Sequence, residues 1–521
     1  ITGAGTARDC ALRGLRVLLI ERFDIATGAT GRNHGLLHSG ARYAVTDQES
    51  ATECIKENMI LKKIARHCVD DTSGLFITLP EDDLAYQDTF VKACLAAGIN
   101  AEVIDPEEAK RMEPSVNPSL IGAVKVPDGS VDPFRLCASN VFDAKIHGAK
   151  VLVYSEVIEF IKEQDTIKGV KVLDHHTGIV TDYYAPVTVN AGGIWGHHIA
   201  QMAGANISMF PAKGALLIFA HRVNSVVINR CRKPANADIL VPGDTVCVIG
   251  TTSTRVPYEE CGHLKVTPDE VDLLLTEGAK LAPCLVETRV LRAYAGVRPL
   301  FSADNDPSGR NISRGIVCLD HETRDGIKGF ISITGGKLMT YRLMGEMAAD
   351  AVCKKLGRDA KCVTADTPLP GSEPGGIEEI SKKIWEVPTM VQKASVGRFG
   401  TQAANLDFDG DVKGSLVCEC EEVSVSEVDS AIENLDVNNL VDLRRRTRFG
   451  MGTCQGELCA CRAAGRLAKA RKCTAKARAD LKDFMDERWK GMYPVAWGET
   501  LRESAYTQWV YSEVMGLGEE I

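Results

Sequence analysis

Residues 2–21 read TGAGTARDCALRGLRVLLIE. Small and apolar residues recur through the first part of this segment, and residues 16–20 form an apolar run of the kind expected for a buried strand. A helix followed by a strand that ends in a carboxylate is typical of a dinucleotide-binding βαβ unit. In that unit the helix N-terminus faces the pyrophosphate and the acid binds the ribose. We therefore expect Gly3, Gly5 and Glu21 to contact a dinucleotide cofactor.

The complete form of this motif has one more strand and two more glycines before the helix. The chain begins with Ile1 rather than methionine, so Gly3 would be the third glycine of the motif. We expect the sequence to be truncated by about one strand at this end. A helix and a strand alone are equally compatible with an ordinary structural pair.

Three glycine-rich segments further along the chain strengthen the prediction. Residues 29–43, ATGRNHGLLHSGARY, form a loop rich in hydrogen-bond donors. Residues 189–195, VNAGGIW, form a strand that ends in small residues and so permits close backbone approach. Residues 331–341, ISITGGKLMTY, lead from a strand into a helix whose free N–H groups can stabilise an anionic oxygen. The further cofactor contacts expected from these segments and from the residue after Glu21 are Arg22, Thr30, Ala191, Gly192, Trp195, Gly335, Gly336, Lys337 and Leu338.

Five cysteines lie close together near the C-terminus, as Cys418-Glu419-Cys420 and as Cys454, Cys459 and Cys461. Four thiolates bind a [2Fe–2S] cluster, and two short loops can supply them. The Cys-x-Cys and Cys-x4-Cys spacing resembles small [2Fe–2S] domains of the bacterioferritin-associated-ferredoxin type, which implies Cys418, Cys420, Cys454 and Cys459 as ligands. Cys461 is the alternative to Cys459. A closed zinc site also takes four thiolates, although its cysteine pairs usually have a longer spacing, and unliganded thiols are a third interpretation.

Length and composition limit the class of protein. A chain of 521 residues with 45% hydrophobic and 25% charged residues is a soluble globular protein of about three to four domains. The net charge of −9 argues against nucleic acid as a partner. The 18 cysteines, without a secretion signal, favour a reducing cytosol. The longest apolar run, residues 215–220, is too short to cross a membrane, so any membrane contact is expected to be peripheral.

Three segments resemble the FAD-dependent glycerol-3-phosphate dehydrogenases: HSGARY at 38–43, GVRPL at 296–300 and the turn GGK at 335–337. With the cysteine motif added, the chain is similar to the catalytic subunits of the anaerobic branch of that family, over nearly its whole length. The resemblance implies an α/β fold: a D-amino-acid-oxidase-like FAD domain interleaved with a mixed-sheet substrate domain. A small α-rich [2Fe–2S] domain and a helical tail follow.

The resemblance also implies an activity, the oxidation of sn-glycerol 3-phosphate to dihydroxyacetone phosphate. Hydride passes to FAD, and single electrons then pass through the [2Fe–2S] cluster to partner subunits and a quinone, menaquinone, in anaerobic respiration. The implied partners are a companion flavoprotein and a membrane-anchoring iron–sulfur subunit, and the implied location is the cytoplasmic face of the inner membrane. One alternative is a related FAD-dependent L-2-hydroxyglutarate dehydrogenase. Another is an electron-relay subunit with an inactive flavin site.

Oxidation at C2 of such a substrate requires a base for the hydroxyl proton, and histidine suits this task. His38 occupies the matching position in the family's flavin-side loop and is the expected catalytic base, with His34 as its rival. Guanidinium groups match phosphate oxygens in shape and charge. Arg42 and Arg298 are therefore the expected phosphate contacts, and Arg298 is also assigned to the catalytic set.

Other charged or polar residues are secondary candidates. Lys337 is expected to add positive charge beside the substrate or at the anionic edge of the flavin, and Tyr43 to donate a hydrogen bond to the substrate. His221 is a weak candidate. The run Arg444-Arg445-Arg446 with Arg448 is interpreted as a solvated helix face, or as positive charge that offsets an anionic cluster or attracts an acidic partner.

The expected domain division follows the distribution of strand-breaking residues. The flavoprotein part spans 1–362, with an inserted substrate domain at about 80–180 and 205–300. A proline- and glycine-rich linker and helical connector occupy 363–410. The [2Fe–2S] domain spans 411–470, and the helical tail spans 471–521.

Overall fold

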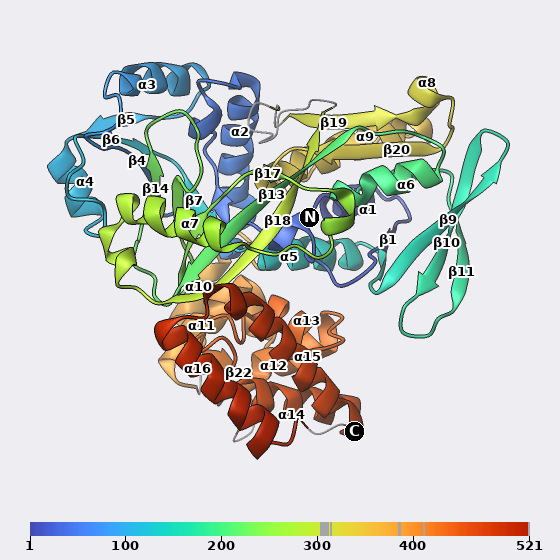
Figure 1. Ribbon diagram of the computed structural model, residues 1–521. Helices are drawn as coiled ribbons and strands as arrows, with labels where there is room; N and C mark the ends of the chain where they lie inside the picture. The colour runs from blue at the N-terminus through green and yellow to red at the C-terminus, as the bar shows by residue number, and fades with distance from the viewer. Residues whose placement is uncertain (303–311, 313–314, 384–386, 410–411, 519–521) are drawn as a thin grey trace.

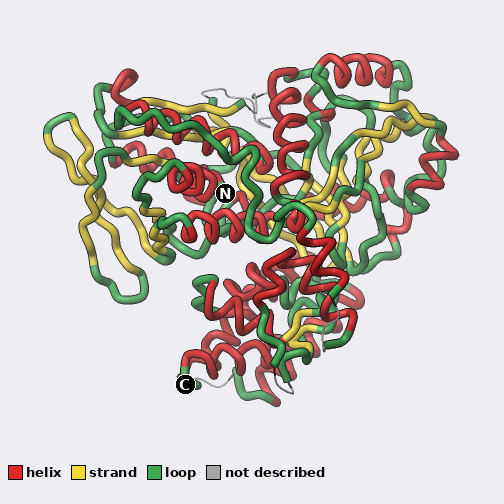
Figure 2. Tube along the Cα trace, turned by 180° about the vertical axis from the view of Figure 1, so that it is seen from behind, coloured by secondary structure: helices red, strands yellow, loops and turns green. Residues whose placement is uncertain are grey.

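The computed structural model describes residues 1–302, 312, 315–383, 387–409 and 412–518. Figure 1 shows an upper part that combines strands and helices and a lower part, coloured orange to red, that holds the C-terminal segments. Figure 2 shows the same division from behind, with the lower part formed almost wholly of helices and one short pair of strands.

The expected helix and strand at the start of the chain are present as α1 (Thr2–Leu12) and β1 (Leu18–Ile20). α1 packs against α5 (Pro133–Ile146) and α9 (Tyr341–Lys355), and β1 pairs in parallel with β8 (Lys150–Leu152). A separate sheet places β12 (Thr188–Asn190), β20 (Phe330–Gly335) and β19 (Ile316–Asp320) side by side, with β12 and β20 parallel. These two sheets and their helices form the nucleotide-binding part.

The mixed sheet expected for the substrate domain is confirmed as a nine-stranded sheet. Its order is β17-β13-β16-β15-β14-β4-β6-β5, and β18 pairs with β13. The pair β14 and β4 is parallel, whereas the other neighbours are antiparallel. The strands are β4 (Gly74–Thr78), β5 (Glu102–Ile104), β6 (Gly122–Val126), β13 (Met209–Phe219), β14 (Val227–Arg230), β15 (Ile239–Pro242), β16 (Cys247–Gly250), β17 (Thr254–Arg255) and β18 (Val290–Phe301).

The remaining elements of the upper part connect or cover these sheets. They are η1 (Ala29–Gly31), β2 (Leu36–Leu37), η2 (Ala41–Tyr43), α2 (Gln48–Ile64), β3 (Val69–Asp70), α3 (Tyr86–Ala96), α4 (Pro106–Met112), β7 (Gly129–Val131), β9 (Ser155–Glu163), β10 (Thr166–Asp174), β11 (Val180–Tyr184), η4 (Gly193–Trp195), α6 (Gly196–Met202), α7 (Pro268–Leu281), α8 (His321–Asp325) and η7 (Leu338–Thr340). The expected stretch 80–180 therefore combines strands of the large sheet with α5 and β8, which pack in the nucleotide-binding part.

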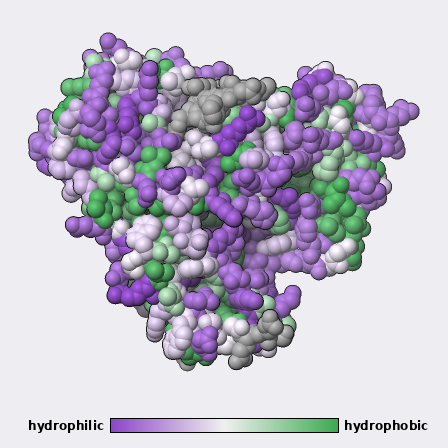
Figure 3. All heavy atoms as spheres, in the orientation of Figure 1, coloured by the Kyte–Doolittle hydropathy of each residue, from purple (hydrophilic) through white to green (hydrophobic). Residues whose placement is uncertain are grey.

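Strands β9, β10 and β11 form a separate antiparallel sheet that projects at one side of the molecule (Figure 1). Ile179, directly before β11, and Tyr184, on β11, are exposed. In Figure 3 hydrophilic residues prevail on the drawn face, and hydrophobic residues gather in small groups, one of them at the side where β9–β11 project. Within the described ranges, the structure contains no helix that combines the length and the apolar character needed to span a membrane.

The lower part contains a connector, a strand pair and a group of helices. These are α10 (Gly376–Lys382), α11 (Thr389–Phe399), β21 (Leu416–Cys418), β22 (Val423–Ser424), α12 (Val425–Asn434), α13 (Leu440–Thr447), α14 (Ala460–Arg471), α15 (Ala475–Met492) and α16 (Gly498–Trp509). Phe484 of α15 and Tyr511 after α16 pack in the same apolar core as Cys459 and Phe449. The cysteine-bearing segment and the tail thus share one core, although the sequence suggested two units.

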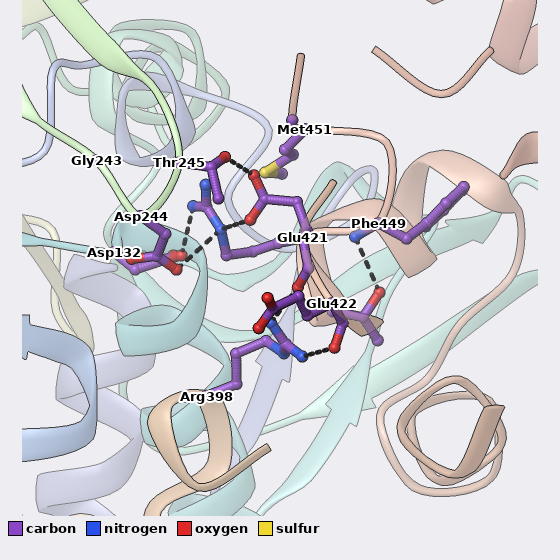
Figure 4. A network of polar contacts seen from close by, with 12 residues as sticks. Asp132, Gly243, Asp244, Thr245, Arg398, Glu421, Glu422, Phe449 and Met451 are labelled. Atoms are coloured by element: carbon purple, nitrogen blue, oxygen red, sulfur yellow. Dashed lines mark hydrogen bonds and ion pairs between the residues drawn. The ribbon is translucent and has the colours of Figure 1, made fainter. Parts of the chain in front are cut away.

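A buried ionic network joins the two parts. Arg448, just after α13, contacts Asp132 at 2.9 Å, Asp244 at 3.1 Å and Glu421 at 2.9 Å. Figure 4 shows the two aspartates of the upper part facing Glu421 of the cysteine loop. Burial alone would raise the pKa of Asp244, but Arg448 and Arg135 together hold it well below its usual range.

The arginine run therefore serves the interface. Arg445 and Arg446 both bind the fully buried Asp24 of the upper part, at 2.9 Å and 2.5 Å. Arg446 is itself buried. The interpretation of this run as a solvated helix face is wrong, because the partner carboxylates lie far away in the sequence and no local pattern reveals them.

We expect Arg448→Met to destabilise the docking of the lower part by about 3–5 kcal/mol, since it leaves three carboxylates without their shared cation. Three of the five tryptophans, Trp489, Trp497 and Trp509, lie in the tail, so urea unfolding followed by tryptophan fluorescence measures the effect. Arg462→Met is the matched control. Arg462 pairs with Glu419 at the surface, with side chains 41% and 51% exposed, and its loss should cost about 0–1 kcal/mol. Equal shifts in both variants would contradict the assignment.

Candidate active site

A large cavity of about 2030 Å³ lies between the nucleotide-binding part and the large sheet. Of the residues expected to contact cofactor or substrate, all but Gly5 line it. They are Gly3, Glu21, Arg22, Thr30, His38, Arg42, Tyr43, Ala191, Gly192, Trp195, Arg298, Gly335, Gly336, Lys337 and Leu338. Segments distant in the sequence are thus brought to one site.

The start of α1 and the end of β1 form one end of the cavity. Glu21 directly follows β1, and its carboxylate accepts a hydrogen bond from the Phe23 N–H at 3.1 Å. Burial raises the pKa of the Glu21 carboxyl. The Arg22 guanidinium lies over the rings of Phe23 and Trp195, at 4.7 Å and 5.0 Å from their centroids. The Thr30 hydroxyl contacts the amino group of Ile1 at 2.9 Å.

Gly3 and Gly5, which the sequence placed in the same motif, have different surroundings. Gly3 lines the cavity near Leu19 and Ala191. A Cβ on Gly5 would lie 2.7 Å from the Tyr341 ring. The absence of a side chain at Gly5 therefore allows α1 and α9 to pack closely. Gly5 faces Tyr341 of α9 and does not line the cavity, in contrast to the expectation that it contacts the cofactor.

The cavity wall also contains the glycine pair before η7. Gly335 and Gly336 have φ values of 77° and 66°, a backbone conformation that strongly favours glycine. This double turn places Lys337 at the cavity wall, where its Nζ lies 4.6 Å from the centroid of the Tyr43 ring. Lys337 also hydrogen-bonds the Cys54 thiol. His38 lies on the other side of Tyr43, with the two ring centroids 5.4 Å apart.

Arg298 lies on β18 and reaches the cavity beside Gly214, where a Cβ would come within 2.7 Å of its guanidinium. The guanidinium donates to the Thr252 carbonyl at 3.0 Å and to the hydroxyls of Thr251 and Ser253, the latter at 3.3 Å. These contacts come from the loop after β16. They fix the direction of the side chain along the cavity wall.

Arg42 is held by the loop before β15, which lies next to the segment that holds Arg298. Its Nη2 donates to the Ala235 carbonyl at 3.0 Å and to Asp238 at 3.2 Å. Its Nη1 is buried and has no hydrogen-bond partner among the described residues. A buried unpartnered N–H is costly, so this atom suits an acceptor on a bound ligand.

The two histidines of the loop, His34 and His38, differ in their hydrogen-bond partners. Leu36 N–H donates to Nδ1 of His34 at 3.2 Å, so the neutral ring carries its hydrogen on Nε2. Burial, with Arg298 and Arg42 nearby, lowers the pKa of His34 to about 3. His34 is therefore a neutral hydrogen-bond donor at physiological pH.

His38 is positioned by α2, because Asn58 donates to the backbone carbonyls of both Leu37 and His38 at 3.1 Å. The side chain lines the cavity. His221, the weak candidate, is exposed in the loop after β13 and does not line this cavity.

The residues that hold the two arginines were missed by sequence reasoning. Asp238 lies between two strands of the large sheet, and Thr251, Thr252 and Ser253 directly follow β16. The polar run 251–254 after an apolar strand is a usable signal for the second group. Asp238 has no comparable signal, because its pairing with Arg42 depends on a contact across 196 residues.

The cavity fits the FAD expected from the sequence. Its wall includes Gly3, Glu21 and the Gly335-Gly336-Lys337 turn. Backbone and small side chains line much of this length, which permits close approach of a planar ring system and a pyrophosphate.

The cysteine site lies in the lower part, on the loops before α12 and α14. The thiols interact in pairs, Cys418 with Cys459, Cys459 with Cys454 and Cys454 with Cys420. These hydrogen bonds lower the pKa of the Cys418 and Cys454 thiols and raise the pKa of their partners Cys420 and Cys459, so the four thiols titrate as one coupled group. Cys461 instead contacts Met515 at 3.6 Å and hydrogen-bonds Tyr511.

The chemistry of this donor set fits two irons. A two-iron cluster divides its four thiolates between its irons. The four thiols contact one another in the order Cys418, Cys459, Cys454 and Cys420, so one connected group can supply the four thiolates.

Comparison with known proteins agrees with this geometry. A family model described as FAD dependent oxidoreductase matches residues 1–342, and one described as BFD-like [2Fe-2S] binding domain matches residues 416–467. The A subunit of the anaerobic glycerol-3-phosphate dehydrogenase of Haemophilus influenzae is 62% identical over 519 residues, 99% of this chain and 92% of that protein. The protein of the same name from Escherichia coli K12 is 62% identical over 520 residues, 100% of this chain and 96% of that protein.

A solved structure shares the fold. The glycerol-3-phosphate dehydrogenase of Bacillus halodurans, complexed with FAD, superposes with a TM-score of 0.68 at 21% identity and covers 96% of this chain and 94% of that chain. The chain is thus an FAD-dependent oxidoreductase with a [2Fe–2S] domain, which confirms the expected fold class and cofactors. It belongs to the family of the anaerobic glycerol-3-phosphate dehydrogenase A subunits.

The choice between Cys459 and Cys461 remains a prediction, for which the thiol contacts provide a test. We expect Cys459→Ser to lose the cluster, because Cys459 lies between two other predicted ligands. Cys461→Ser should retain it. Iron content and the electron paramagnetic resonance (EPR) signal of the dithionite-reduced proteins measure the difference, and a signal retained only in Cys459→Ser would reverse the assignment.

Proposed function

We propose that this protein oxidises sn-glycerol 3-phosphate at its C2 hydroxyl to dihydroxyacetone phosphate and delivers the electrons to partner subunits and a quinone. The proposal rests on one observation: the same cavity is lined by Arg42, Arg298, His34 and His38. When bound, FAD takes the hydride from C2, and the cluster carries electrons away one at a time.

Binding of the phosphate is the proposed task of the two arginines. Arg42 offers its buried, unpartnered Nη1, and Arg298 is fixed by the loop after β16. Two guanidinium groups at the wall of one cavity can bind a dianion together and orient the rest of the substrate. Tyr43 lies beside His38, and Lys337 lies beside Tyr43; both are the proposed contacts nearer the reacting carbon.

The roles of the histidines follow from their hydrogen bonding. His34 already accepts a hydrogen bond at Nδ1, so its Nε2–H can only donate, for example to the oxygen on C2. This leaves His38 as the group that takes the hydroxyl proton while C2 loses its hydrogen. A donor and a base around one oxygen favour its conversion to a carbonyl.

Electron exit is proposed to use Cys418, Cys420, Cys454 and Cys459 as cluster ligands, followed by a companion flavoprotein and a membrane-anchoring iron–sulfur subunit that reduces menaquinone. The names of the relatives support this, since they describe one component of an anaerobic enzyme. The proposed location is peripheral, on the cytoplasmic face of the inner membrane. An anaerobic screen of phosphorylated polyols and 2-hydroxyacids, monitored by flavin bleaching, tests the substrate; bleaching only by 2-hydroxyglutarate would refute it.

Arg298→Met should raise KM for glycerol 3-phosphate by about 10- to 100-fold, the effect of losing a hydrogen bond between charged groups worth about 1.5–3 kcal/mol. The weak reaction with glycerol should change little, because glycerol has no phosphate. Arg255→Met is the control, since Arg255 lies on the neighbouring β17 and does not line the cavity. If both substrates lose affinity equally, Arg298 is not a phosphate contact.

His38→Asn should lower the rate of flavin reduction by about 10²- to 10⁴-fold, the usual contribution of a general base, with a small effect on KM. His34→Asn should cost much less, because asparagine also donates a hydrogen bond. Stopped-flow measurement of flavin reduction compares the two variants. A larger loss in His34→Asn would assign the base to His34.

A further inference from the structure

Two half-buried arginines meet at the loop that carries the second cysteine group. Arg292, on β18, and Arg444, on α13, each donate to the side-chain carbonyl of Gln455 at 3.3 Å. Gln455 directly follows Cys454 and is itself buried. Its amide donates to the backbone carbonyls of Met451 and Gly452, both at 2.9 Å, so its carbonyl must face the arginines.

The positive charge of this pair is poorly offset by protein groups. Gln455 is neutral, and neither arginine forms an ion pair among the described residues. The Nε of Arg444 is buried without a hydrogen-bond partner. The nearby acid Glu487 interacts electrostatically with both arginines, but it also pairs with Lys490 at 3.3 Å.

The packing leaves little room for another side chain beside Arg292. A Cβ on Gly491 would come within 2.5 Å of its guanidinium. Two like charges that share one neutral acceptor in a buried site are unfavourable unless an anion lies nearby. Both guanidinium groups contact Gln455, which adjoins Cys454, so the anion that fits is at the cysteine site.

A [2Fe–2S] core held by four thiolates is a dianion when oxidised and a trianion when reduced by one electron, so neighbouring cations favour the reduced form. We propose that Arg292 and Arg444 are positioning residues that stabilise the reduced cluster and thereby make it a better electron acceptor. The inference rests on the cluster assignment made under the proposed function.

Strand β18 links this pair to the substrate site. Residues 292, 294, 296 and 298 alternate along one face of the strand. Arg298, at one end of this row, lines the cavity, and Arg292, at the other end, contacts the cysteine loop. Between them, the Tyr294 hydroxyl donates to the backbone carbonyl of Asn33, in the cavity loop, at 2.7 Å. Because Arg292 and Arg298 lie on the same strand, their positions relative to each other are fixed.

The test is an anaerobic redox titration of the cluster, monitored by EPR in the full-length protein. In Arg292→Met and in Arg444→Met, the ratio of reduced to oxidised cluster at a fixed potential should fall about tenfold, which is 59 mV for a one-electron couple. Arg292→Lys and Arg444→Lys retain the charge and should stay close to the wild-type midpoint. Arg502→Met removes an exposed cation that is paired with Glu499 on α16, and should also leave the midpoint unchanged.

Each outcome decides the proposal. An unchanged midpoint in both methionine variants would overturn it, as would equal shifts in the methionine and lysine variants, because shape rather than charge would then matter. If the methionine variants lose iron, the lysine variants decide. A cluster that the lysine variants retain at the wild-type midpoint supports the proposal, and loss of iron from the lysine variants as well overturns it. Wild-type protein purified anaerobically without an iron–sulfur signal would instead refute the cluster assignment itself.

Discussion

The ionic network centred on Arg448 determines how the two redox sites lie relative to each other. Arg448 follows α13 and binds Glu421, the residue directly after Cys420, and it also binds Asp132 and Asp244 of the upper part. The cysteine loop is thereby attached to the scaffold that forms the cavity. A buried network of this kind contributes little net stability, because desolvation offsets most of the attraction between the charges. Its contribution is to specify one docking geometry.

Strand β18 imposes a second constraint of the same type. A strand of the large sheet has little freedom to bend, since β13 pairs with it along most of its length. Arg298 at the cavity and Arg292 at the cysteine loop therefore cannot move independently. The network at Arg448 and the contacts of β18 approach the cysteine loops from two directions, which is sufficient to fix a small domain in orientation as well as in position.

Much of the cavity could be predicted from the sequence because its contacts come from short segments with local signals. Glycines before Lys337, and the loop around His38, have a recognisable composition, and the resemblance to a family assigned roles to them. Gly5 shows the limit of that reasoning. A glycine near a helix N-terminus suits a pyrophosphate or a close helix contact equally well, and only the position of Tyr341 decides between them.

The remaining features depend on contacts between residues far apart in the sequence. The arginine run resembles a solvated face because its partner, Asp24, lies 422 residues from Arg446. The tail resembles a separate unit because nothing local indicates that Phe484 completes the core around Cys459. Hydrophobic periodicity shows that a face is buried but does not identify its partner.

The two histidines illustrate how backbone contacts assign chemistry that residue type leaves open. His34 and His38 lie four residues apart in the same loop, and their ring centroids are 5.9 Å apart. The Leu36 N–H donates to Nδ1 of His34, so the other ring nitrogen, Nε2, carries the hydrogen and can only donate to a ligand in the cavity. Nearby guanidinium charge adds to burial in keeping that ring neutral, so the two arginines proposed to bind the phosphate also keep His34 from holding a proton. In the proposed mechanism, phosphate binding and the choice of base are therefore linked through the same two arginines.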